Sequence, residues 1–197
     1  MTLDEIKAGY PRTITLSSGT SIELRMVTTA DRNPILEFAR SLPEEDLLFL
    51  RVDLTEPKNV DEWIKRIESG QSAAIAAYEG ERLVGYAKLH RETARWTRRL
   101  GEIRVNVSPD LRGKGLGRIL TSHIFDVGQA MGLRKLTAHM IADQHGAQAA
   151  FRRLGFVPEA LLADYVEDGN GKPRDLVIMS HDIDGLTEFV PTPLRAI

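Results

Sequence analysis

Residue polarity along the first third of the chain predicts a β-hairpin followed by helices. Residues 13–16 and 21–27 alternate polar and apolar side chains on either side of a Ser-Ser-Gly-Thr turn, as paired strands do. Apolar side chains then recur at helical spacing over residues 35–39, after a capping residue at Thr29 or Asp31. Two further helices are predicted within residues 43–50 and over about residues 60–68.

The rest of the chain continues with strand and helix patterns. Three strands are predicted over residues 73–78, 83–90 and 102–108. A long helix follows, because apolar residues recur every three to four positions from Leu116 to Met131, and Gly132 can end it. After it come a strand over residues 133–141, a helix capped by Asp143, and two strands over residues 156–166 and 176–180.

Length, composition and charge narrow the class of protein. The 197 residues fit one domain over residues 1–197, because domains commonly hold ~100–200 residues. A net charge of -2 excludes a protein held to nucleic acid by bulk positive charge. The absence of cysteine excludes disulfides and a thiolate nucleophile. With no signal segment and no run of ~18 apolar residues, we expect a cytoplasmic protein without a membrane partner.

The densest group of candidate functional residues lies between residues 102 and 118. A predicted strand is followed there by Gly113, Gly115 and Gly117 and then by the long helix. Glycine allows backbone amides to approach a ligand closely, and a helix N-terminus favours anions. Residues 91–118 also hold eight Arg or Lys against three acids, in a chain that is net negative. The segment therefore predicts an anion-binding loop.

Two familiar phosphate loops do not fit this spacing. A nucleoside triphosphate loop needs Ser or Thr after Gly113-Lys114, where this chain has Gly115. A dinucleotide-binding fold needs its third glycine three positions after the second, and Gly117 follows Gly115 by two. The segment instead resembles the pyrophosphate loop of the GNAT acetyltransferase superfamily: Gln or Arg, two residues, Gly, one residue, then Gly or Ala. Arg112, Gly115 and Gly117 match that pattern.

A second motif matches the same superfamily further along the chain. Ala147, Phe151 and Gly155-Phe156 resemble its closing helix, in which an Ala, an aromatic residue and then Gly-Phe recur. The order of predicted elements matches as well, so the resemblance covers about residues 21–182 and leaves a tail over residues 183–197. It implies an α/β fold with a mixed, mostly antiparallel central sheet and helices on both faces.

The resemblance also implies that acetyl coenzyme A is the cosubstrate. Its pyrophosphate would lie against the backbone amides of residues 112–118, and its pantetheine arm along residues 105–107, where family members have a bulge that splays two strands. The residues that the resemblance assigns to the cofactor are Val105, Asn106, Val107, Arg112, Gly113, Lys114, Gly115, Leu116, Gly117, Arg118 and Gln144. Gln144 lies where an Asn often contacts the pantetheine arm. The five histidines show no zinc-protease spacing, so no metal is expected.

Glu102 is the candidate general base. An amine attacks a thioester only after losing its proton, so some group must accept that proton. On the predicted strand, Glu102 shares a face with Arg104, opposite the apolar face of Ile103. Many GNAT members carry a catalytic glutamate at this strand position, and the resemblance assigns that role to Glu102. The other interpretation is a structural carboxylate neutralised by Arg104, and the residues alone leave both open.

The usual general acid is missing from the sequence. Alignment on Gly155-Phe156 puts Phe151 where many members have a Tyr that protonates the departing thiolate. Phe cannot donate a proton. Tyr165, Tyr86 and His90 are alternative donors, unless the thiolate leaves unassisted.

The resemblance implies an acetyl-CoA-dependent N-acetyltransferase for a primary amine on a small molecule or a protein. Without cysteine, transfer would be direct, in a ternary complex. The alternative is a catalytically silent coenzyme A binding or sensing module, because the Tyr is missing. Residues 44–68 hold eight acids and four bases where the family shapes its acceptor site, which favours a cationic acceptor. A homodimer is left open.

Overall fold

The computed structural model describes residues 2–47, 50, 52–91 and 94–183 of the chain. The strands are β1 (Arg12–Thr15), β2 (Ser21–Met26), β3 (Ser72–Glu79), β4 (Arg82–Arg91), β5 (Leu100–Val107), β6 (Lys135–Ile141), β7 (Val157–Glu167) and β8 (Pro173–Asp182). The helices are α1 (Leu3–Ala8), α2 (Arg32–Ser41), α3 (Glu44–Leu47), α4 (Pro57–Glu68), α5 (Leu116–Ala130) and α6 (His145–Arg152). Two 3-10 turns are η1 (Thr29–Asp31) and η2 (Pro109–Leu111). The predicted tail lies outside the described residues except for Ile183.

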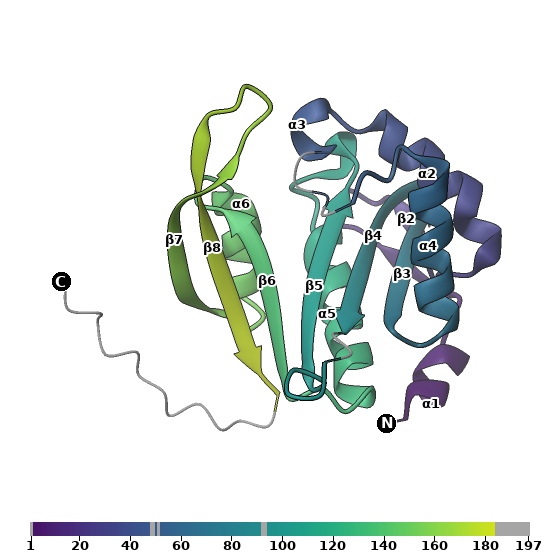
Figure 1. The fold of residues 1–197 in the computed structure, drawn as a ribbon. Coiled ribbons are helices and arrows are strands. Elements are labelled where there is room, and N and C mark those ends of the chain that lie inside the picture. Colours follow the sequence, from purple (N-terminus) through teal and green to yellow (C-terminus); the bar gives the residue numbers. More distant parts are fainter. Residues whose placement is uncertain (1, 48–49, 51, 92–93, 184–197) are drawn as a thin grey trace.

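All the strands of the described residues lie in one sheet, in the order β1-β2-β3-β4-β5-β6-β8-β7 (Figure 1). Neighbouring strands are antiparallel except β5 and β6, which pair in parallel. The predicted α/β fold with a mixed, mostly antiparallel sheet is confirmed. None of the helices that the structure describes is long and apolar enough to cross a membrane.

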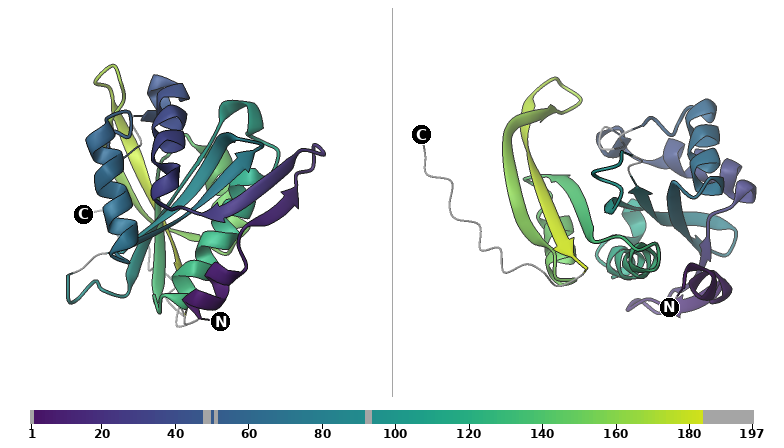
Figure 2. Two further views of the ribbon diagram at one scale, coloured as in Figure 1. Left: turned by 90° about the vertical axis from the view of Figure 1, so that its right-hand side faces the viewer. Right: turned by 60° about the horizontal axis from the view of Figure 1, so that its bottom comes forward.

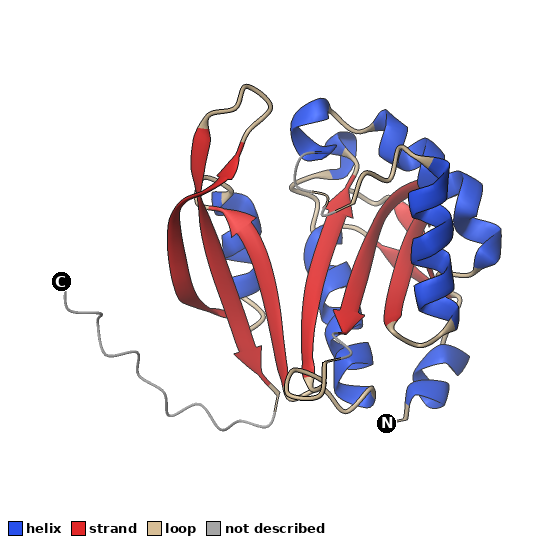
Figure 3. Ribbon diagram, viewed as in Figure 1, coloured by secondary structure: helices blue, strands red, loops and turns tan. Residues whose placement is uncertain are grey.

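Helices cover both faces of the sheet, as predicted (Figure 3). On one face α2 and α4 pack Phe38 and Trp63 against Tyr86 of β4. On the other face α5 buries Leu120 and Ile124 in a separate cluster with residues of β3, β4 and β5. β3 is therefore buried on both faces, which explains why its sequence is an almost unbroken apolar run.

The structure adds a helix at the N-terminus that the apolar pattern does not predict. In α1 the Thr2 hydroxyl accepts a hydrogen bond from the Glu5 N–H at 3.2 Å, and the Glu5 carboxylate accepts one from the Thr2 N–H at 2.8 Å. This reciprocal capping box is a sequence signature of a helix start. Ile6 is buried in the same cluster as the residues of α5, so α1 packs beside that helix (Figure 2).

One of the two predicted helix caps is confirmed and the other is wrong. Asp31, one of the two residues predicted to cap the helix over residues 35–39, is the N-cap residue of α2, and its carboxylate accepts a hydrogen bond from the Thr28 N–H at 2.7 Å. Gln144 is the N-cap residue of α6 in place of the predicted Asp143. For α6 the pattern locates the helix but misses its cap by one residue, because neighbouring polar residues are equally good caps by type.

β5 and β6 separate after a short stretch of pairing. They pair over three residue pairs only, the last of which joins Glu102 to Thr137. Beyond that point β6 diverges from β5 while it stays paired with β8, as Figures 1 and 2 show. The predicted separation is present, but the predicted bulge is not: β4 and β5 keep an unbroken register from Gly85–Val107 to Arg91–Gly101.

Candidate active site

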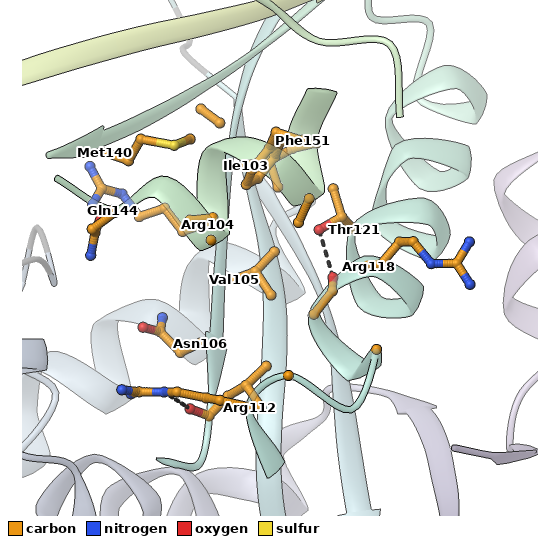
Figure 4. Close-up of a pocket in the computed structure, with 18 of the residues that line it drawn as sticks. Ile103, Arg104, Val105, Asn106, Arg112, Arg118, Thr121, Met140, Gln144 and Phe151 are labelled. Carbon is orange, nitrogen blue, oxygen red and sulfur yellow. Dashed lines mark hydrogen bonds between the residues drawn. The ribbon is translucent and has the colours of Figure 1, made fainter. Parts of the chain in front are cut away.

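A cleft of about 510 Å³ lies between the second half of β5, the end of β6 and the first turn of α5. Val105 and Asn106 line it from β5, His139 and Met140 from β6, and Phe151 from α6 (Figure 4). Because β5 and β6 are not paired here, the β5 backbone between residues 105 and 107 borders the cleft on this side. The end of the cleft at α5 is formed by the glycine loop.

The glycine loop has a backbone that other residues adopt only with strain. Gly113 has a φ of 75° and Gly115 a φ of 91°, both in the left-handed region. A Cβ atom added at either glycine would meet no atom within 4 Å, so the loop is bare on that side. Gly115 is also the N-cap residue of α5, and in the described part of the chain no side chain caps this helix. The first amides of α5 therefore border the cleft beside a loop without side-chain bulk.

Basic side chains surround this helix start. Arg104, Arg112, Arg118 and Arg153 all line the cleft. The Arg112 guanidinium donates to the Val107 carbonyl at 3.2 Å and to an Asp46 carboxylate oxygen at 2.5 Å. Four guanidinium groups together with an uncapped helix N-terminus favour an anionic ligand, even with one carboxylate present.

The structure gathers most of the predicted cofactor residues at this cleft. The predicted residues that line it are Val105, Asn106, Val107, Arg112, Gly113, Gly115, Gly117, Arg118 and Gln144. The Leu116 side chain is instead fully buried in the core, and Lys114 does not line the cleft. The Gln144 side-chain oxygen accepts from the Ile141 N–H at 3.2 Å. Lys114 and Leu116 are therefore the two predicted cofactor residues that the described lining of the cleft leaves out.

A second pocket of about 360 Å³ lies on the opposite face of β5, against β4 and α4. Glu102, His90 and Tyr86 line it, and Arg104 lines both this pocket and the cleft. The Glu102 carboxylate lies 2.6 Å from the Arg104 guanidinium and is 12% exposed. Glu102 therefore lies on the face expected from strand alternation, beside Arg104, its expected partner. It lines the second pocket and not the cleft.

Sequence reasoning missed several residues of the cleft. Asp46 comes from α3 and reaches the cleft only through folding, while His139 and Met140 come from the end of β6. Nothing local in the sequence marks these positions, because they meet the glycine loop only after the strands separate. Among the described residues, no group of three His, Asp or Glu side chains is placed to hold a metal ion.

The comparison with known families decides between the classes of anion-binding fold. Residues 37–156 match the family described as the acetyltransferase (GNAT) family, and this stretch is more than half of the chain. The chain belongs to the GNAT acetyltransferase family.

Curated relatives of this GNAT chain match part of its length. A mycothiol acetyltransferase of Beutenbergia cavernae is 38% identical over 66 residues, which are 33% of this chain and 22% of that protein. A mycothiol acetyltransferase of Geodermatophilus obscurus is 35% identical over 92 residues, 43% of this chain and 29% of that protein. The matched stretch thus spans about a quarter of these curated relatives.

Solved structures share the fold over most of this GNAT chain. A GNAT acetyltransferase from Streptococcus pneumoniae has a TM-score of 0.74 at 18% identity, covering 82% of this chain and 99% of that one. The yncA protein of Salmonella typhimurium, solved with its cofactor acetyl-CoA, has a TM-score of 0.71 at 22% identity, covering 84% and 96%. At this level of identity the likeness establishes the fold.

The candidate proton donors of this GNAT chain are spread over the molecule. Tyr165 is 65% exposed on β7 and lines neither pocket. Tyr86 is buried, and burial raises the pKa of its hydroxyl. His90 lies in the second pocket, with Nδ1 3.3 Å from the Ser72 hydroxyl. Phe151 lines the cleft and packs against Phe156 at a ring distance of 5.0 Å.

None of the three proposed substitutes lines the cleft, whereas His139 does. An imidazole can donate a proton near neutral pH, which the aromatic ring at Phe151 cannot do. His139 lies on β6 at the wall opposite Val105 and Asn106. The structure thus places a candidate proton donor, His139, in the cleft that the sequence pattern did not indicate.

Proposed function

We propose that this chain is an acetyl-CoA-dependent N-acetyltransferase that moves the acetyl group directly to a primary amine. The observation that carries the proposal is the arrangement of two pockets on opposite faces of β5, with Arg104 in the wall of both. One pocket suits a long anionic cosubstrate, and the other gives an acceptor access to Glu102. Two reactants can therefore be present together, as direct transfer requires.

The open glycine loop, the arginines and the unpaired edge of β5 support acetyl-CoA as the ligand of the cleft. The added Cβ atoms at Gly113 and Gly115 would meet nothing, so a pyrophosphate can approach these backbone amides without a side chain between them. Arg112 and Arg118 would supply charge to the same phosphates. The unpaired edge of β5 from Val105 to Val107 offers backbone groups to an amide-containing arm.

Bound acetyl-CoA supplies a thioester carbonyl that an uncharged amine can attack. The Glu102 carboxylate would accept the proton that the ammonium of the acceptor must lose, directly or through water. The amine nitrogen forms the new C–N bond and loses a second proton to solvent, the C–S bond breaks, and the electron pair leaves with sulfur. With no cysteine in the chain, the acetyl group has no thiol of the protein to pass through. His139 or water would return a proton to the sulfur.

Gly115→Glu tests the cofactor loop. The new side chain would place a carboxylate beside the helix start, so we expect acetyl-CoA affinity to fall at least ~100-fold through lost access and charge repulsion. Calorimetric titration with acetyl-CoA measures this. The matched control is Gly132→Glu, at the opposite end of α5, where φ is also positive at 69° and a Cβ would also meet nothing within 4 Å. Near-normal affinity of the Gly115 variant would refute the loop assignment.

Release of free thiol from acetyl-CoA, measured across amines, polyamines and lysine peptides, tests the transfer itself. Thiol release that depends on one class of amine supports the acetyltransferase. Tight acetyl-CoA binding without release for any amine would instead support the coenzyme A binding or sensing module.

A further inference from the structure

The connection between β4 and β5 exposes a tryptophan. Trp96 is 89% exposed, whereas Trp63, the other tryptophan of the chain, is 3% exposed. An indole has a large apolar surface, and tryptophan contributes strongly to protein interfaces when that surface is buried. Residues 94–99, which we call the Trp96 turn, therefore carry a side chain that is suited to burial against a partner.

Hydrogen bonds hold the backbone of the Trp96 turn in place. The Leu100 N–H donates to the Thr97 carbonyl at 2.8 Å. The Arg134 N–H donates to the Arg99 carbonyl at 2.8 Å, which attaches the turn to the residue before β6. Trp96 is thus presented on a fixed turn, so binding of a partner requires little ordering of the backbone.

Arginines flank the exposed indole. Residues 91–99 hold four Arg and one Glu. Among the residues that the structure describes, no carboxylate lies within ion-pair distance of the Arg95 or Arg98 guanidinium. The Arg98 guanidinium donates to the Arg95 carbonyl at 2.5 Å, a hydrogen bond that leaves its positive charge in place. Because arginine binds carboxylates strongly, the turn suits a partner with an apolar surface beside acidic groups.

The Trp96 turn lies next to the second pocket. His90 and Glu102 line this pocket and pair with each other across β4 and β5, one residue pair before the pairing of the two strands ends. In the left view of Figure 2 the connection protrudes beyond these strand ends, on the side of the sheet that carries α4. The same helix supplies Arg66 to the pocket. Trp96 is six residues from Glu102, so at most about 22 Å separates them.

A small amine that fills the second pocket does not extend to the turn. The pocket has a volume of about 360 Å³, and Trp96 does not line it. An extended polypeptide covers about 3.3 Å per residue, so residues up to about six positions from an amine held at Glu102 can reach the turn. Contact with both surfaces therefore requires an acceptor that continues outside the pocket.

We infer that the acceptor is a polypeptide, with acidic and apolar residues near its amine that bind the Trp96 turn. This inference rests on the proposed function and names its substrate class. A nucleic acid fits less well, because it is bound by a basic groove with successive aromatic stacking surfaces. Residues 91–99 hold one aromatic side chain, and the net charge of -2 weakens the long-range attraction of the whole chain for a polyanion.

Matched peptides and one small amine test the inference in wild-type protein with acetyl-CoA. One pair of peptides has a blocked N-terminus and a central Leu-Lys, flanked by Glu in one peptide and by Gln in the other. A second such pair has a free N-terminus and no lysine, and butylamine represents the lysine side chain alone. We expect the Glu peptide of at least one pair to release thiol with a kcat/KM at least ~10-fold higher, through a lower KM.

Two results of this assay would overturn the inference. One is equal or better turnover of the Gln peptide in both pairs. The other is thiol release with butylamine and with none of the peptides.

Two variants locate the preference at the turn. Trp96→Ala and Arg95→Gln should each raise the KM for the Glu peptide about five- to tenfold, while kcat and the KM for butylamine stay the same. The matched controls are Leu161→Ala on β7 and Arg152→Gln on α6, because both residues are exposed and line neither the cleft nor the second pocket. A preference for the Glu peptide that survives both turn variants would overturn the assignment to this turn.

Acrylamide quenching of Trp96 fluorescence measures docking without turnover. The emission of Trp96 is the part of the wild-type signal that Trp96→Phe removes, since the remaining Trp63 is buried. In protein saturated with coenzyme A, the Glu peptide should reduce quenching of this part at least ~2-fold by burying the indole, and the Gln peptide should have less effect. Protection by a single-stranded oligonucleotide and not by the Glu peptide would overturn the inference in favour of a nucleic acid.

The two readouts separate this inference from the proposed function. Protection of Trp96 by the Glu peptide without thiol release from any amine would support the docking surface and refute the transferase. Thiol release with the peptides, without protection of Trp96 or preference for Glu, would support the transferase and refute the docking surface.

Discussion

Arg104 connects the two halves of the candidate site. Its guanidinium lies in the wall of the cleft and in the wall of the second pocket, and it contacts Glu102 at 2.6 Å. A guanidinium is planar and permanently charged, so it can fix the direction of the carboxylate while still facing both pockets. The contact with Arg104 holds the Glu102 carboxylate in one position, and a general base needs such a fixed position.

The variant Glu102→Gln distinguishes between two roles of Glu102, a general base and a carboxylate that only stabilises the strand. Glutamine keeps the shape and a hydrogen-bonding oxygen but accepts no proton, so we expect turnover to fall ~10²- to 10⁴-fold with acetyl-CoA affinity almost unchanged. Steady-state kinetics at saturating amine and calorimetry measure the two quantities. Turnover of the variant within a few-fold of wild type would show that Glu102 is not the base and has only a structural role.

Sequence alone could identify those site residues that belong to a local pattern. Arg112, Gly113 and Gly115 lie in one loop whose residue types indicate an anion site. Strand alternation gives only the face on which Glu102 lies, and its role as a candidate base comes from the family resemblance. Arg66 and His139 could not be found this way, because they reach the site only through the packing of α4 and β6. Their roles depend on which elements become neighbours, which no short stretch of sequence encodes.

Among the elements, α3 and the glycine loop are joined by one ion pair. Asp46 of α3 contacts Arg112 at 2.5 Å, and both residues line the cleft. The Asp46 side chain is 17% exposed, so its charge is only partly screened by water. A carboxylate at this place would compete with the phosphate of the proposed cosubstrate for the Arg112 guanidinium.

Asp46→Asn tests this competition. Removing the negative charge should free Arg112 for phosphate, so we expect acetyl-CoA affinity to rise about two- to tenfold, with a smaller gain at high salt. Calorimetry at low and high ionic strength measures this. Asp53→Asn is the control, because Asp53 belongs to the same segment but does not line the cleft. Weaker binding would mean that the pair positions Arg112 productively instead of competing with the ligand.

The order of the elements was largely predictable, and their ends were not. Apolar periodicity located every strand of the sheet and the helices from α2 onward, because burial of one face is repeated over many residues. The short α1 was missed, since its six residues bury a single side chain, Ile6. The separation of β5 from β6 came from the family resemblance, and its cause, the early end of parallel pairing, required the structure.

The molecule as a whole depends on α5, which carries the glycine loop at one end and packs against the sheet along its length. The N-terminal segment is attached to this helix through Tyr10, whose hydroxyl lies 2.7 Å from Nδ1 of His123. The two rings also meet edge to face at 5.9 Å.

Three statements about the whole molecule stay predictions. They are that residues 1–197 form one domain, that the chain can form a homodimer and that the protein is cytoplasmic.

His123 should make the stability of the molecule sensitive to mild acid. Burial lowers the pKa of the His123 imidazole, with Arg12 contributing in the same direction. The unfolded chain, in which the imidazole has its ordinary pKa of about 6.5, therefore binds a proton more readily than the folded chain. The contribution of His123 to the free energy of unfolding should be fully present above about pH 6.5. It should decrease as the pH falls below that value.

His123→Gln tests this dependence, because glutamine can still accept a hydrogen bond from Tyr10 but does not titrate. We expect the variant to lie within ~1.5 kcal/mol of wild type at pH 7.5, the range of one hydrogen bond, and to lose less stability than wild type between pH 7 and pH 5. Urea unfolding across that range measures the difference between the two proteins. His145→Gln, at an exposed position on α6, should follow the wild-type curve. Parallel curves for wild type and the His123 variant would show that this imidazole does not couple the N-terminal segment to pH.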